Sequence, residues 1–186
     1  MDSPQIRLKE ESEPAQFEAE KVGIIFDSNL RRWFSRNLGI WRSRRQYFFE
    51  EEDVINLEMF LRIEEVLPDS SQNAKYRFSW WSENDNNIAF FKANPKYKKE
   101  GVILAELRGH QLYRDNNYLC NSSIISNIRQ VDEHELIFES HYENWDVLEH
   151  TRLIDQDKYR YRSIYSWDGD QLKIVENHHE TKMHSD

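Results

Sequence analysis

The chain has 186 residues, with 34 acidic and 25 basic side chains and a formal net charge of −9. The length fits one domain, and the acidic excess argues against broad nucleic-acid binding, which depends on Lys and Arg at phosphates. Six Trp, 9 Tyr and 10 Phe exclude a disordered chain, although only 38% of the residues are hydrophobic. No apolar run approaches the roughly 18 residues of a membrane helix, and one cysteine excludes a disulfide framework. We therefore expect a soluble, intracellular, single-domain protein.

The first segment of the chain is polar and acidic and carries two of the four prolines. Residues 1–22 are predicted to form a flexible tail, because such compositions bury too little apolar surface to offset the entropy of ordering. A single domain is then expected over residues 23–186.

The first regular element predicted is a short amphipathic helix. Asp27 and Ser28 are suitable N-caps. Behind them, apolar residues follow helical spacing at Phe26, Leu30, Trp33, Phe34 and Leu38. Gly39 ends this pattern. We expect one helix over about residues 28–37.

After Gly39 the apolar period changes to two, which predicts β-strands separated by turn residues. The expected strands cover residues 41–49, 55–63, 76–82, 88–92 (a short one), 102–108, 111–114, 118–129, 135–142, 145–153, 159–167 and 171–180. Residues 50–67 are also compatible with a helix, because four acidic residues precede mixed apolar ones.

About ten short strands joined by tight turns indicate an antiparallel meander. Closure into a barrel protects the edges of such a sheet most completely. Eight strands just hold side chains or one small ligand, whereas ten leave more room. The predicted fold class is therefore all-β, a closed antiparallel barrel preceded by one short α-helix.

Common catalytic motifs are missing. The sequence contains no glycine-rich phosphate loop, no G-x-S-x-G elbow and no HExxH pair. His178, His179 and His184 lie near the C-terminus, where we expect a solvated segment rather than a metal site. No metal is predicted, and ordinary hydrolase, kinase and metalloenzyme chemistry has no support.

Charged residues on aromatic strand faces are more informative. Glu149 shares a face with Trp145 and Val147, and Arg45 shares one with Trp41. Arg160 and Arg162 lie together on a further face. Burying such charges costs several kcal/mol unless they find partners. Two explanations remain open, namely an internal Glu–Arg salt bridge that only holds the barrel, or a large, aromatic, acidic ligand bound by these groups.

A second feature is a basic stretch in an acidic protein, with six arginines between Arg31 and Arg45. It is either a solvated surface balanced by the acidic residues 50–53 or a docking surface for an acidic partner.

Several segments, in order and at similar spacing, resemble the S-type phycobiliprotein lyases (the CpcS/CpeS family). They are residues 39–45, 78–82, 101–115 (GVILAELRGHQLYRD), 131–132, 139–149 and 159–162. The most specific stretch is Leu112-Tyr113-Arg114-Asp115. The resemblance covers residues 26–182, and the Gly39-x-Trp41 pair after a helix also looks like a lipocalin start.

The resemblance implies a ten-stranded lipocalin-like (calycin) barrel that binds an open-chain tetrapyrrole. It implies a bound phycobilin, phycoerythrobilin or phycocyanobilin, as substrate. The bilin would be attached by a thioether to a cysteine of an apo-phycobiliprotein α or β subunit, in phycobilisome biogenesis for photosynthesis. It also implies a homodimer or a related lyase subunit as partner, no nucleic acid, no membrane span, and a cyanobacterial cytoplasm or a plastid stroma as location.

The resemblance also suggests site residues. Trp80 resembles the tryptophan that lies against the bilin, and Glu149 resembles the pocket carboxylate. Arg45 and either Arg160 or Arg162 resemble the basic groups for the propionates. Trp41 and Ser43, on the same face as Arg45, complete the predicted binding set.

The acceptor protein would supply the nucleophilic thiolate. Glu149, the predicted catalytic residue, would be buried with a raised pKa and would hydrogen-bond the pyrrole nitrogens or give a proton as sulfur adds. Two rivals remain, a non-catalytic lipocalin-like carrier of a bilin or other amphiphile, and a structural protein whose barrel is filled by its own side chains.

Overall fold

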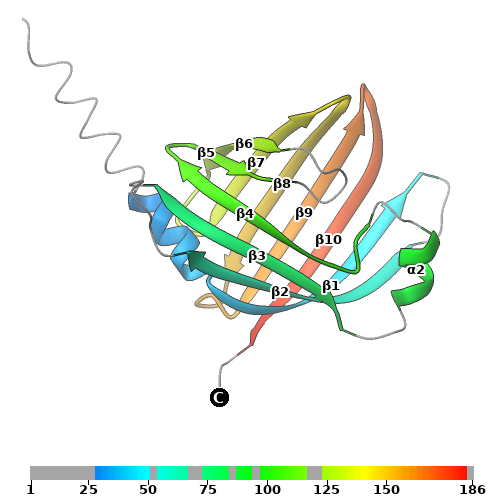
Figure 1. Cartoon of the computed structure of the whole chain (residues 1–186), viewed down its shortest axis with the longest axis horizontal. Helices are drawn as coiled ribbons and strands as arrows, with labels where there is room; N and C mark the ends of the chain where they lie inside the picture. The colour runs from blue at the N-terminus through cyan, green and yellow to red at the C-terminus, as the bar shows by residue number, and fades with distance from the viewer. Residues whose placement is uncertain are drawn as a thin grey trace, which may run out of the picture.

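The computed structural model describes residues 28–50, 54–66, 73–83, 87–93, 97–116 and 123–183. The predicted tail, residues 1–22, lies outside the described residues. Ten antiparallel strands close into a barrel in the order β1-β10-β9-β8-β7-β6-β5-β4-β3-β2 (Figure 1). They are β1 (Gly39–Phe49), β2 (Ile55–Val66), β3 (Ala74–Ser82), β4 (Glu100–Arg108), β5 (Gln111–Arg114), β6 (Ile124–Gln130), β7 (Glu135–Tyr142), β8 (Trp145–Ile154), β9 (Tyr159–Asp168) and β10 (Gln171–Met183). The all-β barrel prediction is confirmed.

Side chains alternate between the interior and the solvent along each strand, as the period of two predicted. On β1, Trp41, Ser43, Arg45 and Tyr47 are buried while the residues between them face outward. Residues 55–66, where a helix was also considered, form a strand whose inward apolar face joins the core. Of the predicted strand over 118–129, the structure shows β6 from Ile124 onward, Ser123 is outside any strand, and residues 117–122 lie outside the described residues.

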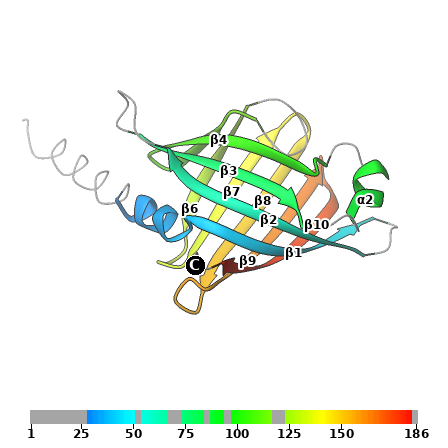
Figure 2. The same ribbon diagram turned by 60° about the horizontal axis from the view of Figure 1, so that its bottom comes forward.

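A helix over residues 28–36, as predicted, packs against one end of the barrel (Figure 1 and Figure 2, blue). Its apolar face buries Trp33 and Phe34 inside the barrel end. The Trp33 indole donates to the backbone oxygen of His134 at 3.0 Å, and the Arg36 guanidinium pairs with Asp157 at 2.6 Å. The helix is therefore tied to two of the turns at that end.

The predicted strand over 88–92 is wrong, because α2 (Ile88–Ala93) is a helix at the opposite end of the barrel (Figure 2). A short apolar run does not separate strand from helix by periodicity. In the closed barrel β3 already pairs with β2 and β4, which leaves no edge for another strand there. The helix instead turns Phe90 inward against Tyr47 and Tyr97, at ring distances of 5.8 and 5.3 Å. No helix among the described residues is long and apolar enough to cross a membrane.

The basic stretch divides between the two sides of the barrel wall. Arg36 pairs with Asp157, and Arg42 pairs with Glu83 at 2.8 Å on the outer surface. Arg45 points inward and is only 8% exposed. Part of the stretch therefore holds the barrel together, while docking of an acidic partner on the rest stays a prediction.

Candidate ligand-binding site

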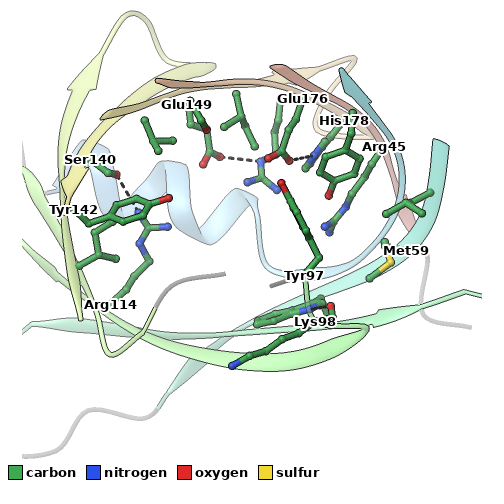
Figure 3. A pocket seen from close by; sticks show the side chains of 18 of the residues that line it. Arg45, Met59, Tyr97, Lys98, Arg114, Ser140, Tyr142, Glu149, Glu176 and His178 are labelled. Atoms are coloured by element: carbon green, nitrogen blue, oxygen red, sulfur yellow. Dashed lines mark hydrogen bonds and ion pairs between the residues drawn. The ribbon is translucent and has the colours of Figure 1, made fainter. Parts of the chain in front are cut away.

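The half of the barrel nearer α2 contains a cavity of about 910 Å³, its open mouth included. Aromatic rings form much of its wall, at Tyr47, Trp80, Phe91, Tyr97 and Tyr142. Charged or titratable groups also line it, at Arg45, Lys98, Arg114, Glu149, Arg162, Glu176 and His178. Figure 3 shows Tyr97 projecting into the middle of the cavity, with Glu149, Glu176 and His178 along the opposite wall. Open space therefore remains among these side chains at this end of the barrel.

A second cavity, of about 580 Å³, lies on the side of the N-terminal helix. Its walls are mainly apolar, with aromatic side chains at Trp33, Phe34, Phe78 and Phe138. Arg114, Glu149 and Arg162 line both cavities. These three side chains form a charged belt across the barrel interior, between an aromatic chamber and the larger, more polar one.

The strand registers explain how the charges come together. Three successive inward-facing rows run across β8, β9, β10 and β1. The rows are Glu149, Ile164, Glu176 and Tyr47, then Thr151, Arg162, His178 and Arg45, then Leu153, Arg160, Glu180 and Ser43. Arg162 is therefore central, one row from Glu149 on one side and one row from Glu180 on the other.

The deepest charged pair joins Arg160 and Glu180, which face each other directly across β9 and β10. Both side chains are at most 3% exposed. Arg160 also donates to Asn37 at 2.9 Å and lies 4.5 Å above the Trp41 ring. Burial alone would raise the pKa of Glu180, but Arg160 and Arg162 outweigh it and lower that pKa to about 2. This pair is an internal salt bridge that joins the barrel end to the helix.

Glu149 accepts hydrogen bonds from Arg162 Nε and Thr151 Oγ1, both at 2.8 Å and both on Oε1. Burial favours the neutral acid, but Arg162, Arg114 and Thr151 outweigh it and lower the Glu149 pKa. The expected raised pKa of Glu149 is therefore wrong, because two neighbouring guanidinium groups stabilise its charge. Glu149 is a carboxylate at neutral pH and a hydrogen-bond acceptor.

The raised pKa belongs to Glu176 instead. Burial raises the pKa of Glu176 to about 7, against the opposing effects of Arg45 and Arg162. His178 Nε2 lies 2.9 Å from Glu176 Oε2. Burial and the nearby arginines hold the pKa of His178 well below 6.5, so its ring is neutral at neutral pH.

Trp80 lies flat over a glycine on the neighbouring strand. Trp80 pairs with Gly101, and a Cβ added at Gly101 would lie 2.2 Å from the indole. The indole Nε1 donates to the backbone oxygen of Lys98 at 3.0 Å. Gly101 therefore provides the space for the ring, and the Lys98 carbonyl sets its orientation at the cavity wall.

The structure brings Trp80, Arg45, Glu149 and Arg162 together on the larger cavity. Arg160 lines the smaller cavity. Trp41 and Ser43 are fully buried and line neither one. Trp41 instead stacks on Arg160, and Ser43 accepts a hydrogen bond from Arg45 Nε at 3.1 Å.

Four residues of this interior were missed from the sequence, namely Arg114, Glu176, His178 and Glu180. The last three occupy alternate positions of β10, the same signal that identified Arg45 and Glu149. The expectation that His178 is solvated is wrong, since its position near the C-terminus belongs to a strand that closes the barrel and leaves it 2% exposed. Arg114 donates to Ser126 and to Ser140, the latter at 3.3 Å, on a strand of four residues too short to show a period.

No protein-family model and no curated protein matches the chain. Solved structures that share its fold include the S-type phycobiliprotein lyase CPES from Guillardia theta, with a TM-score of 0.63 over 84% of this chain and 94% of that chain. A protein of unknown function from the DUF3598 family of Nostoc punctiforme PCC 73102 has a TM-score of 0.56, over 80% of this chain and 48% of that chain. Both are 15% identical to this chain. The chain thus has the ten-stranded lipocalin-like barrel fold of an S-type phycobiliprotein lyase, and the resemblance seen in the sequence is confirmed in the fold.

Proposed function

We propose that this chain binds an open-chain tetrapyrrole in its larger cavity and attaches it by a thioether bond to a cysteine of an apo-phycobiliprotein subunit. The single observation that carries the proposal is an aromatic cavity with an excess of buried positive charge inside a protein of net charge −9. The fold shared with a phycobiliprotein lyase supports it.

The interior charges fit an acidic, flat, conjugated ligand. Arginines at 45, 114, 160 and 162 stand against glutamates at 149, 176 and 180. Glu176 is only half ionised near pH 7, so positive charge is in excess. Arg160 is paired with Glu180, and the cations that line the larger cavity are Arg45, Lys98, Arg114 and Arg162. Two propionates would offset this excess by charge-assisted hydrogen bonds.

The ligand's other groups also find partners on the cavity wall. The Trp80 ring would stack on the conjugated face of the bilin, because it lies flat on Gly101 at the wall. The Glu149 carboxylate would accept the pyrrole N–H groups. Arg162 has a shared role, since it holds Glu149 ionised and lies at the boundary of both cavities.

Catalysis would consist of holding the bilin in one extended conformation and offering its ring A ethylidene group at the mouth. Orientation of this kind supplies several kcal/mol of barrier reduction. The nucleophile would come from the acceptor subunit, so the proposal needs no reactive cysteine from this chain.

A matched pair of variants tests the binding mode. Arg45→Gln removes an inward cation, and Arg44→Gln removes its neighbour, which is 69% exposed on the outer surface. Titrations with phycoerythrobilin and phycocyanobilin are followed by visible absorbance. A charge-assisted hydrogen bond contributes about 1.5–3 kcal/mol, so Arg45→Gln should bind about 10- to 100-fold more weakly. Arg44→Gln should bind like the wild type.

The second half of the experiment adds apo-phycobiliprotein to the loaded protein and measures colour that survives denaturation. Covalent colour on the acceptor supports the lyase, and binding without transfer supports a carrier. No spectral change with either bilin would exclude both and return the barrel to a structural role.

A further inference from the structure

The barrel contains a second carboxylate that the proposed function has not used. Glu176 lies in the same cross-strand row as Glu149, with Ile164 between them. Both line the larger cavity. Two carboxylates in one pocket with different surroundings are a common basis for two chemical roles.

The surroundings of Glu176 favour an exchangeable proton. Glu149 lies against guanidinium and hydroxyl donors that stabilise its negative charge. Glu176 instead meets the neutral ring of His178 at 2.9 Å, which is itself 2% exposed. Its cross-strand neighbour on β1 is Tyr47, whose hydroxyl also hydrogen-bonds it.

The contact between Glu176 and His178 holds a single proton. With the carboxyl protonated, its O–H donates to Nε2. With the carboxyl ionised, the ring N–H donates back. His178 Nδ1 has no hydrogen-bond partner among the residues that the structure describes, so neither arrangement of the ring is locked by a second bond. The ring can therefore stay neutral and hydrogen-bonded to Glu176 in both protonation states of the carboxyl, by changing its tautomer.

We propose that Glu176, held by His178 and Tyr47, is the acid that donates the proton to the bilin during thioether formation, while Glu149 acts only as an acceptor for the ligand. This assignment rests on the proposed function. The acceptor thiolate forms the carbon–sulfur bond at the exocyclic carbon of the ring A double bond. The π electrons of that bond move to the ring carbon, which takes the proton from Glu176. The proton released earlier by the thiol returns through solvent to the Glu176 carboxylate.

Glu176 faces charged or titratable groups from every packed element. These groups are Arg45 and Tyr47 on β1, Arg114 on β5, Glu149 on β8, Arg162 on β9, His178 on β10, and Tyr97 and Lys98 before β4. An anionic ligand adds negative charge to this set and favours the protonated carboxyl further. Binding near pH 7.5 should therefore take up protons from solution.

The test compares Glu176→Gln with Glu149→Gln, and uses Glu139→Gln, 53% exposed on the outer surface, as a matched control. A general acid contributes about 10²- to 10⁴-fold, so Glu176→Gln should lose at least 100-fold in the transfer rate and keep its bilin affinity within about 3-fold. The wild-type transfer rate should fall as pH rises through 7, because Glu176 loses its proton, and Glu176→Gln should not show this fall. Glu149→Gln should weaken binding but keep that decline, and Glu139→Gln should match the wild type.

Two further measurements separate the possible failures. Calorimetry in buffers of different ionisation enthalpy counts the protons taken up on binding, with uptake expected in the wild type and none in Glu176→Gln. Infrared titration of the free protein should show a carboxyl band that disappears near pH 7 and is missing in Glu176→Gln. The backbone amide bands of the same spectra check that this variant is folded. If the wild type transfers bilin and Glu176→Gln matches its rate and pH profile, the assignment of Glu176 is overturned. If the wild type transfers none, the proposed function itself is overturned, together with the donor role that rests on it.

Discussion

Replacing Gly101 with alanine should displace the indole of Trp80 and so damage the cavity wall without touching any charged group. The added Cβ would lie 2.2, 2.5 and 2.9 Å from three atoms of the ring. Ordinary contact begins at 3.4 Å, so the ring has to move by about 1.2 Å. Overpacking of this kind costs about 1–3 kcal/mol.

Two smaller effects act on the same substitution. The bond from Trp80 Nε1 to the Lys98 carbonyl, 3.0 Å long, would be stretched or lost, at about 0.5–1.5 kcal/mol. Alanine also restricts the unfolded chain, which stabilises by about 0.4–1 kcal/mol. We therefore expect Gly101→Ala to lower the free energy of unfolding by roughly 1–3 kcal/mol in urea denaturation. Bilin affinity should fall at the same time.

A double-mutant cycle isolates the contact. Trp80→Ala removes the ring, so adding Gly101→Ala to it should cost nothing further, and the two changes should be strongly non-additive. Gly109→Ala is the control, since a Cβ there meets no atom within 4 Å and only its φ of +56° is strained. It should lose about 1 kcal/mol with no effect on bilin binding. A Gly101→Ala protein as stable as the wild type, or additive changes in the cycle, would refute the reasoning.

Three further predictions concern stability. Glu180→Gln leaves the buried Arg160 uncompensated and should cost about 3–5 kcal/mol in urea denaturation; a loss below 1 kcal/mol would mean that the pair is solvated. Glu176, with its pKa raised from 4.5 to about 7, favours the folded chain at low pH, and this contribution is lost as pH rises from 4.5 through 7. Between pH 4 and 8 the free energy of unfolding of Glu176→Gln should therefore fall by roughly 3 kcal/mol less than that of the wild type. Parallel curves of unfolding free energy against pH for the two proteins would contradict this. Phe34→Ala removes a ring stacked on Tyr76 at 4.8 Å and should cost about 3–5 kcal/mol; thermal unfolding measures it, and an unchanged melting temperature would show that the helix does not close the barrel end.

Much of the architecture could be predicted from the sequence because alternation is a local property. The inward faces of β1, β8 and β9 were assigned from residues two apart, and Arg45, Glu149 and the choice between Arg160 and Arg162 followed from them. The helix at 88–93 could not be predicted from the sequence. In the closed barrel β3 and β4 each already have two neighbouring strands, so residues 88–93 have no strand to pair with, and only the three-dimensional structure shows this.

The protonation states of the site depend on registers between distant strands. Glu149 is ionised because Arg162 and Arg114 come from two other strands, and the sequence does not show their distances. Glu176 has the opposite preference, because burial there outweighs Arg45 and Arg162 and raises its pKa. Both residues look alike as a glutamate on an inward strand face, so pattern alone could not tell acid from acceptor.

Closure of the barrel by pairing of β1 with β10 has a consequence for synthesis in the cell. Glu176, His178 and Glu180 all reside on β10, and their partners Arg45, Arg160 and Arg162 are made earlier. While the ribosome still holds β10, β1 has one open edge and Arg160 lacks the carboxylate of Glu180. The barrel therefore cannot close until β10 has been made, and that interval is when chaperones or proteases would meet the nascent chain.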